Sequence, residues 1–237
     1  FCAHKAYEDT SFQKLYVMLV VISIHNLFFV VHGRTGQLIA IALSGLFIMQ
    51  RLGNKQRLFA SLIIILSLTT YFNFSDKSSR MNEAITSTQA YLKPIPEQTE
   101  SSMGTRYTFW KNSLKLIADK PMVGYGTGSF SKEYSRVVQD ERLGSKNPHN
   151  EFLMIGVQLG LIGLFIYLGF LASQYTCAKK LPNKEKWFAQ GLLLSLIITG
   201  LFNSPFLDHN EGHWYATMIA LCFASLQGKD KAAYLEE

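Results

Sequence analysis

Six long apolar runs, separated by short polar connections and one long polar interval, dominate the pattern of this 237-residue chain. A bilayer core about 30 Å thick is crossed by roughly 20 apolar residues in a helix. The runs are continuous rather than alternating, which predicts helices and not the strands of a membrane barrel. We therefore predict six transmembrane helices, of which the second and sixth are short for a span. They are Leu15 to Val31, Gln37 to Met49, Leu58 to Phe74, Phe152 to Tyr175, Trp187 to Leu207 and Trp214 to Leu226.

The charges of the connections give the predicted helices an orientation. The connection between the second and third runs carries three basic residues and no acid, and the one between the fourth and fifth carries four lysines against one glutamate. The two short connections at 32–36 and 208–213 hold a single arginine between them. Because basic connections stay in the cytoplasm, both chain ends are predicted to be cytoplasmic. The long interval at 75–150 is then periplasmic in a Gram-negative bacterium.

The predicted fold class is therefore all-α, a polytopic helical membrane protein with a long periplasmic loop that contains short helices. Residues 1–74 form three transmembrane helices, residues 75–150 form the loop, and residues 151–237 form three more helices and a cytoplasmic tail. Because a connection of this length is unusual in helical bundles, the loop is expected to be functional or disordered.

Composition narrows the function classes further. Charged residues make up 17% of the chain, against about 25% in a typical soluble domain, and hydrophobic residues make up 48%. These values exclude a disordered chain and argue against a soluble enzyme. The net charge of +6 is compatible with binding to nucleic acid. The basic residues flank apolar runs, however, so we expect the chain to contact membrane lipids and not nucleic acid. The three cysteines are far apart and match neither a disulfide framework nor a metal site.

The second part of the long loop is predicted to be ordered. Residues 106–120 read RYTFWKNSLKLIADK, and helical spacing places four apolar residues on one face. Those four are Tyr107, Trp110, Leu114 and Ile117. Thr105 is a plausible N-cap and Pro121 ends the pattern. With its basic flank, this helix either lies in the membrane interface or packs on the bundle as a small lid.

A glycine-rich segment, GYGTGSF at 124–130, follows this helix. Glycine-rich turns can bring backbone N–H groups close to phosphate. Here no strand precedes the segment and no Lys-Ser/Thr pair ends it, so a nucleotide site is not supported. The sequence predicts a tight turn.

Three polar features at the outer membrane boundary are candidates for chemistry. Arg34 lies between the first and second predicted spans. A charged side chain at this depth usually faces a cavity or a partner, but it can also extend to the lipid headgroups. His149 and Asn150 stand where the long loop returns to the membrane. A histidine with its ordinary pKa near 6.5 can accept a proton at neutral pH. By itself each feature has a purely structural explanation.

The third feature is FLDHNEGHW, between the fifth and sixth spans. Asp208 and His213 belong to it and suggest a metal site, but the spacing matches no zinc or calcium loop. Polar residues at the level of the lipid headgroups are the simpler interpretation. No metal or other cofactor is expected.

Together these motifs resemble a known family. They comprise an arginine at a span boundary (Arg34), R-Y-x-x-W from Arg106 to Trp110, D-x-P-x-x-G-x-G from Asp119, H-N-E-F-L from His149 and then Q-L-G-L-I-G-L. The combination resembles the C-terminal half of bacterial O-antigen ligases and of the related O-antigen polymerases and protein O-oligosaccharyltransferases. The NSPFLDHNEGH stretch resembles their last outer loop.

The resemblance implies an inner-membrane protein of about twelve spans with a GT-C-like architecture and a site facing the periplasm. The six spans here would be its second half, and the start at Phe1 leads us to expect a segment upstream. The implied reaction is metal-independent transfer of a glycan from undecaprenyl diphosphate to a hydroxyl of lipid A-core. By match to the family pattern, Arg34 and Arg106 would bind the diphosphate and His149 would act at the acceptor. Asn150, Trp110, Asp208 and His213 are secondary candidates.

Other functions stay open at this point. A polymerase would transfer to a growing glycan, and a protein O-oligosaccharyltransferase to a serine or threonine. A transporter or flippase would place ionisable groups near the bilayer midplane, where His25 and Asn26 are the main candidates. A sensor would need a loop that folds alone and binds a ligand.

Overall fold

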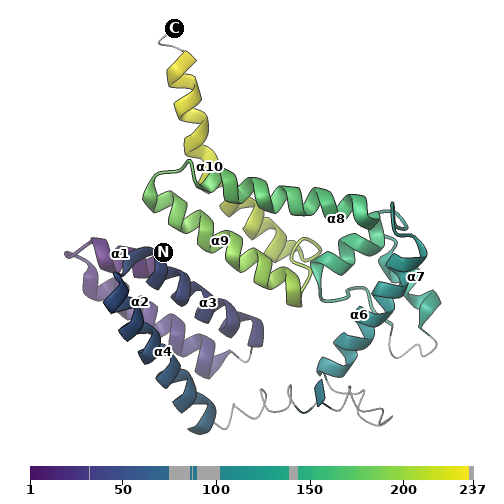
Figure 1. Cartoon of the computed structure of the whole chain (residues 1–237), viewed down its shortest axis with the longest axis horizontal. Helices are drawn as coiled ribbons and strands as arrows, with labels where there is room; N and C mark the ends of the chain where they lie inside the picture. Colours follow the sequence, from purple (N-terminus) through teal and green to yellow (C-terminus); the bar gives the residue numbers. More distant parts are fainter. Residues whose placement is uncertain (32, 75–85, 87, 90–101, 139–143, 235–237) are drawn as a thin grey trace. The chain divides into compact units, whose positions relative to one another are not determined.

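The computed structural model describes residues 1–31, 33–74, 86, 88–89, 102–138 and 144–234. Across this part of the chain every regular element is a helix (Figure 1), which confirms the all-α prediction. The chain divides into two compact units, Phe1–Arg80 and Met81–Glu237. His32 and most of residues 75–101, the first part of the predicted outer loop, lie outside the described residues.

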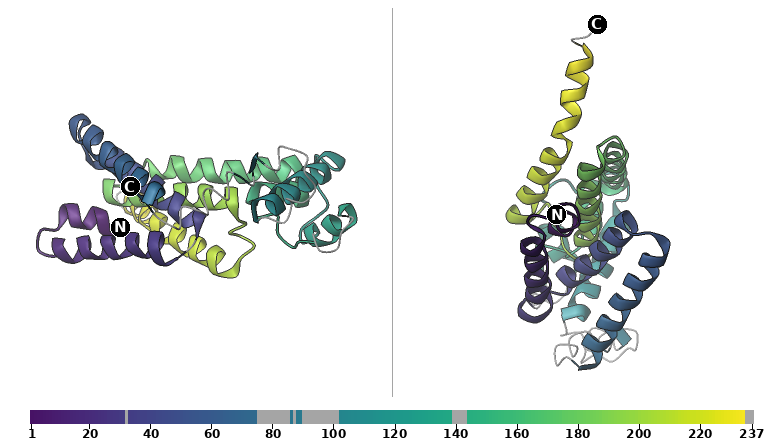
Figure 2. Two further views of the ribbon diagram at one scale, coloured as in Figure 1. Left: turned by 90° about the horizontal axis from the view of Figure 1, so that it is seen from below. Right: turned by 90° about the vertical axis from the view of Figure 1, so that its left-hand side faces the viewer.

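In the first unit, the described residues form five helical elements. They are α1 (Cys2–Glu8), α2 (Gln13–His25), the π-helical turn η1 (Asn26–Val30), α3 (Arg34–Arg51) and α4 (Asn54–Phe74). Figure 2 shows α1 lying beside α2, and the Gln13 side chain donates to the Ala6 carbonyl at 3.1 Å. The first turn of α3 is fixed by Gln37, whose Nε2 donates to the Leu27 carbonyl of η1 at 3.3 Å. This contact sets the position of Arg34, the first residue of α3.

Among its described residues, the second unit contains five named helices. They are α6 (Ser102–Asp119), α7 (Phe130–Val137), α8 (Glu151–Ala178), α9 (Asn183–Phe202) and α10 (His209–Tyr234). One apolar cluster joins α8, α9 and α10 around the fully buried Leu196. A second cluster joins α6 and α7 to the start of α8 around Phe109, Tyr134 and Val157. The outer part of this unit therefore has its own core.

Helix α8 is a hairpin of two limbs rather than one rod. Gly160 has φ 64° and ψ −156°, which are not helical, and the chain turns back on itself there (Figure 1). In an unbroken helix Phe152 and Tyr167 would be about 22 Å apart, yet their ring centroids are 5.3 Å apart. The run predicted as a span from Phe152 to Tyr175 is therefore helical, as expected, but is broken at Gly160.

The break in α8 is closed by the segment that follows α6. The Pro121 and Met122 carbonyls accept from Leu161 N at 2.7 Å and Ile162 N at 3.2 Å. In the other direction, Tyr125 N donates to the Val157 carbonyl at 3.0 Å. Backbone groups freed by the turn thus find partners in residues 121–128, which we call the clamp segment. The tight turn predicted at 124–130 is present, with positive φ at Gly124, Gly126 and Gly128.

Two helical stretches of the described residues are long and apolar enough to cross a membrane, Gln13–Val30 and Glu151–Ala178. Within the second, residues 161–178 alone would extend about 27 Å, close to the thickness of a bilayer core. Their outer face is apolar and open, with Phe165 80% and Ile166 66% exposed. These features indicate a membrane protein. The count of six spans and the three-part division of the chain stay predictions.

Helix α6 differs from its prediction at one end and on one face. It ends at Asp119, just before Pro121 as predicted, but it starts at Ser102, so Thr105 lies within the helix and is not its N-cap. The face that packs into the core carries Phe109, Ser113 and Leu116. Of the predicted apolar face, Trp110 and Ile117 pack against this core, whereas Leu114 is 57% exposed.

Candidate functional site

The segment at 144–150, which leads into α8, has an unusual backbone at His149. Its φ is 52°, and a residue other than glycine in this region is held there at a cost of about 1–3 kcal/mol. Asn147 supplies the restraint, because its Oδ1 accepts from His149 N at 2.7 Å. The same oxygen accepts from the Ser204 hydroxyl at 2.9 Å. The loop is thereby tied to the end of α9.

Asn150 and Glu151 add two further ties between the start of α8 and the connection after α9. Asn150 is the N-cap of α8, since its Oδ1 accepts from Leu153 N at 3.0 Å, the role for which asparagine is favoured. Its Nδ2 donates to the Leu201 carbonyl at 3.1 Å. The carboxylate of Glu151, which is 3% exposed, accepts from Phe206 N at 3.2 Å. These hydrogen bonds hold the backbone around His149 in a fixed position.

Helix α6 packs beside His149. The Phe109 ring stacks on the imidazole, with centroids 6.1 Å apart and planes 21° apart. One residue further along, Trp110 donates from Nε1 to the Pro148 carbonyl at 3.0 Å. Arg106 lies on the turn of α6 that precedes Phe109, and its charge acts on His149. Positions i, i+3 and i+4 of one helix thus surround the histidine.

The electrostatic environment favours a neutral imidazole. Burial lowers the pKa of His149, the positive charge of Arg106 lowers it further, and a side-chain hydrogen bond with Asn203 raises it. The net pKa is below the ordinary 6.5, so at neutral pH the ring is unprotonated and can accept a proton.

Asn203 links the imidazole to an acid. Its Nδ2 donates to Glu211 at 3.1 Å, which leaves the amide oxygen to accept from an imidazole N–H. The order His149, Asn203, Glu211 resembles the arrangement in which a base is oriented by further groups. Chemically, the site offers a proton acceptor held in place and a guanidinium able to bind an anion.

Comparison with known proteins identifies the family. The family model described as O-Antigen ligase matches residues 15–168, a range that includes Arg34, Arg106 and His149. The chain belongs to the O-antigen ligase family. The match ends before α9, so the Asn203 part of the site lies beyond it.

Two curated proteins are similar in sequence to this O-antigen ligase family member. A Haemophilus influenzae protein named "Uncharacterized protein" is 26% identical over 192 residues, covering 75% of this chain and 48% of its own length. A Rickettsia conorii protein named "Putative polysaccharide ligase" is 28% identical over 115 residues, covering 44% of this chain and 28% of its own length. The chain spans less than half the length of either relative.

The structure brings four of the predicted site residues together: Arg106, Trp110, His149 and Asn150. Of these, Asn150 has a structural role as the cap of α8. Arg34 belongs to the other unit, and its role in this O-antigen ligase family protein stays a prediction.

The two remaining candidates lie at the start of α10. Asp208 caps this helix, because its Oδ1 accepts from Asn210 N at 2.9 Å and Glu211 N at 3.3 Å. His213 is exposed, with its ring 5.8 Å from that of His209. Among the residues that the structure describes, no three His, Cys, Asp or Glu side chains form a group able to hold a metal ion.

Sequence reasoning missed Phe109, Asn147 and Asn203, and it considered Glu211 only as part of a metal site. Asn203 and Ser204 form a polar pair inside the predicted fifth span, Trp187 to Leu207. A polar pair within an apolar run is the signal that could have pointed to Asn203. Phe109 gives no such signal, because an aromatic residue in a helix is most simply assigned to the core.

Proposed function

We propose that this chain is part of an inner-membrane O-antigen ligase, with its site facing the periplasm. The enzyme transfers a glycan from undecaprenyl diphosphate to a sugar hydroxyl of lipid A-core. The reaction inverts the anomeric centre and uses no metal. Family membership supports glycan transfer of this general type. The observation that carries the residue roles is a neutral His149 stacked on Phe109 and subject to the charge of Arg106.

The residues fit a direct displacement. A sugar hydroxyl is a weak nucleophile, and a positioned base removes its proton as the oxygen bonds to the anomeric carbon. His149 accepts that proton. The bond from the anomeric carbon to the diphosphate breaks, and the diphosphate leaves with the electron pair. Guanidinium groups stabilise the departing charge, a role we assign to Arg106 and, from the family pattern, to Arg34.

The proposal is tested by lipopolysaccharide banding in a strain that lacks its own ligase but still makes the lipid-linked glycan. We expect the full-length parent of this chain to restore the ladder of glycan-bearing bands. A parent that is well expressed and restores no ladder contradicts the ligase assignment. Purified protein given a growing glycan or a serine-containing peptide as acceptor would then identify a polymerase or a protein transferase.

The pH dependence of transfer gives a test of the site itself. A base is active when unprotonated, so kcat/KM should fall as pH drops through the pKa of His149, with a midpoint below 6.5. Arg106→Gln removes a charge that lowers this pKa, so the midpoint should rise. Asn203→Ala removes a hydrogen bond that raises it, so the midpoint should fall. Purified enzyme at saturating donor and limiting acceptor provides the measurement.

The opposite directions of the two shifts make this result specific. Both variants are expected to be slower than the wild type, and a general loss of structure would move neither midpoint in a defined direction. Midpoints that move the same way in both variants would contradict the proposed surroundings of the base.

A further inference from the structure

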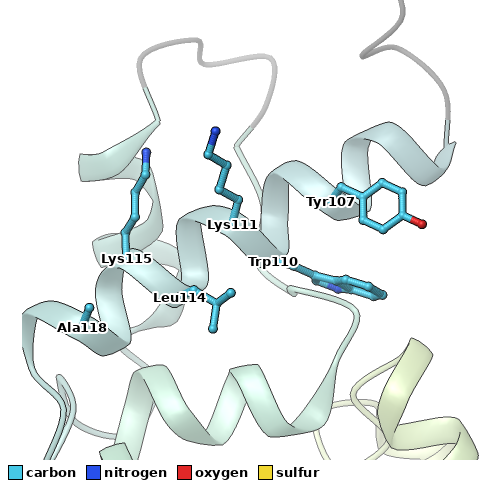
Figure 3. Close-up of a pocket in the computed structure, with 6 residues that line it drawn as sticks. All are labelled: Tyr107, Trp110, Lys111, Leu114, Lys115 and Ala118. Atoms are coloured by element: carbon cyan, nitrogen blue, oxygen red, sulfur yellow. The ribbon is translucent and has the colours of Figure 1, made fainter. Parts of the chain in front are cut away.

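A groove follows the open face of α6 (Figure 3). Its volume is about 520 Å³, and its lining residues are Tyr107, Trp110, Lys111, Leu114, Lys115 and Ala118. They recur at helical spacing, so a single face of one helix forms the lining. Figure 3 shows the two aromatic residues at one end of the groove and Ala118 at the other. The volume is within the range of about 300–1,000 Å³ that ligand sites occupy.

The surface of the groove is apolar, and the two lysines beside it add positive charge, a combination that suits a sugar with negative substituents. Trp110 and Tyr107 offer aromatic rings, against which the C–H faces of pyranose rings can pack. Lys111 and Lys115 are exposed and one helical turn apart, and lysine binds phosphate as a point charge. No acidic residue is among the lining residues. The charge therefore favours an anionic occupant.

The groove and the candidate active site share one residue, Trp110. This side chain lines the groove and also donates to the carbonyl of Pro148, the residue directly before His149. Its indole is thus held in a fixed orientation. The residue before it, Phe109, stacks on the imidazole. An oligosaccharide in the groove would lie next to the proposed base.

We propose that the α6 groove binds the acceptor oligosaccharide and selects acceptors that carry phosphate, through Lys111 and Lys115 with sugar rings packed on Trp110. This inference rests on the proposed function, because it assigns the acceptor to the surface beside His149. It assigns roles to two lysines that the transfer reaction itself does not require.

The test compares two acceptors on the full-length parent in lipid nanodiscs. One is a core oligosaccharide that carries phosphate, and the other is the same oligosaccharide after phosphatase treatment. For the double variant Lys111→Ala/Lys115→Ala we expect KM for the phosphorylated acceptor to rise about tenfold, since two exposed charge contacts are lost. The KM for the dephosphorylated acceptor, the KM for the donor and kcat should stay within about twofold. Lys132→Ala, an exposed lysine of α7, is the matched control and should leave every value unchanged.

Three outcomes would overturn the inference. Equal KM values of the wild type and the double variant for the phosphorylated acceptor would show that the groove does not recognise phosphate. A rise in KM for the donor would make it a donor site, and an equal loss with both acceptors would indicate contact with the lipid surface. Direct binding of the labelled phosphorylated oligosaccharide, measured without donor, separates this inference from the proposed function. The wild type could fail to transfer any glycan and still bind this oligosaccharide about tenfold more tightly than the double variant does. In that case the transferase assignment is wrong, but the assignment of the groove as an oligosaccharide site is supported.

Discussion

His149→Gln should lower the turnover of purified full-length enzyme by about 10²–10⁴-fold, the usual contribution of a positioned base. Glutamine is similar in size and can still hydrogen-bond to Asn203, but it cannot accept a proton at neutral pH. The donor is bound elsewhere in the proposal, so its KM should change little. Single-turnover transfer from a labelled lipid-linked glycan measures this loss at the chemical step.

The matched control is His209→Gln, which changes an exposed histidine at the start of α10 in the same unit. It should keep turnover within about twofold of the wild type. If His149→Gln retained wild-type turnover while folding normally, histidine would not be the base, and the mechanism would need another proton acceptor.

Gly160→Ala should destabilise the protein by about 3 kcal/mol or more, one of the largest effects of any single methyl group in this chain. The backbone at φ 64° and ψ −156° is in a region that is essentially restricted to glycine. A Cβ there would also lie 2.4 Å from the carbonyl oxygen of Met122, a backbone atom that the clamp segment holds in place. The measurement is the midpoint of thermal unfolding in detergent, together with the yield of folded protein.

Gly169→Ala is the matched control for this prediction. Gly169 lies in the second limb of the same helix, and a Cβ there would meet nothing within 4 Å. Alanine is favoured over glycine inside a helix, so the unfolding midpoint should be unchanged or slightly higher. An equally small effect of Gly160→Ala would show that α8 does not turn back at this residue.

The helices of this protein were largely predictable because apolar runs of suitable length determine them. The hairpin in α8 was not. Gly160 is one of three glycines in this run, with Gly156 and Gly163, and their spacing is equally typical of close helix packing. The partners that compensate for the lost helical hydrogen bonds, Pro121 and Met122, are about 40 residues earlier in the chain. Only the folded structure reveals that pairing.

The most deeply buried face of α6 was missed for a different reason. The prediction followed four apolar residues at helical spacing, of which Trp110 and Ile117 do pack against the core. The buried face includes Ser113, a polar residue that normally argues for exposure. Its hydroxyl donates to the Phe109 carbonyl at 2.7 Å, so the polar group is satisfied within the helix and can be buried at little cost.

The candidate site was predictable in part. His149 and Arg106 were found from the types of residue at the membrane boundary and from the family resemblance. Asn203 was missed because its role depends on the fold, which brings the end of α9 to the loop before α8. Long-range hydrogen bonds of this kind, such as the one from Ser204 to Asn147, leave no periodic signal in the sequence.

The backbone pairing between the clamp segment and the α8 hairpin determines how the outer loop can be exchanged between relatives. The pairing brings the two backbones so close that neither Gly124 nor Gly160 has room for a Cβ, so a clamp and a hairpin must match each other. A chimera that transplants only the loop up to residue 120 would keep its own clamp and hairpin together and should fold. One whose junction falls between residues 128 and 151 would join a clamp from one parent to a hairpin from the other. Residues 121–162 are therefore the smallest piece that can be moved between such proteins as a whole.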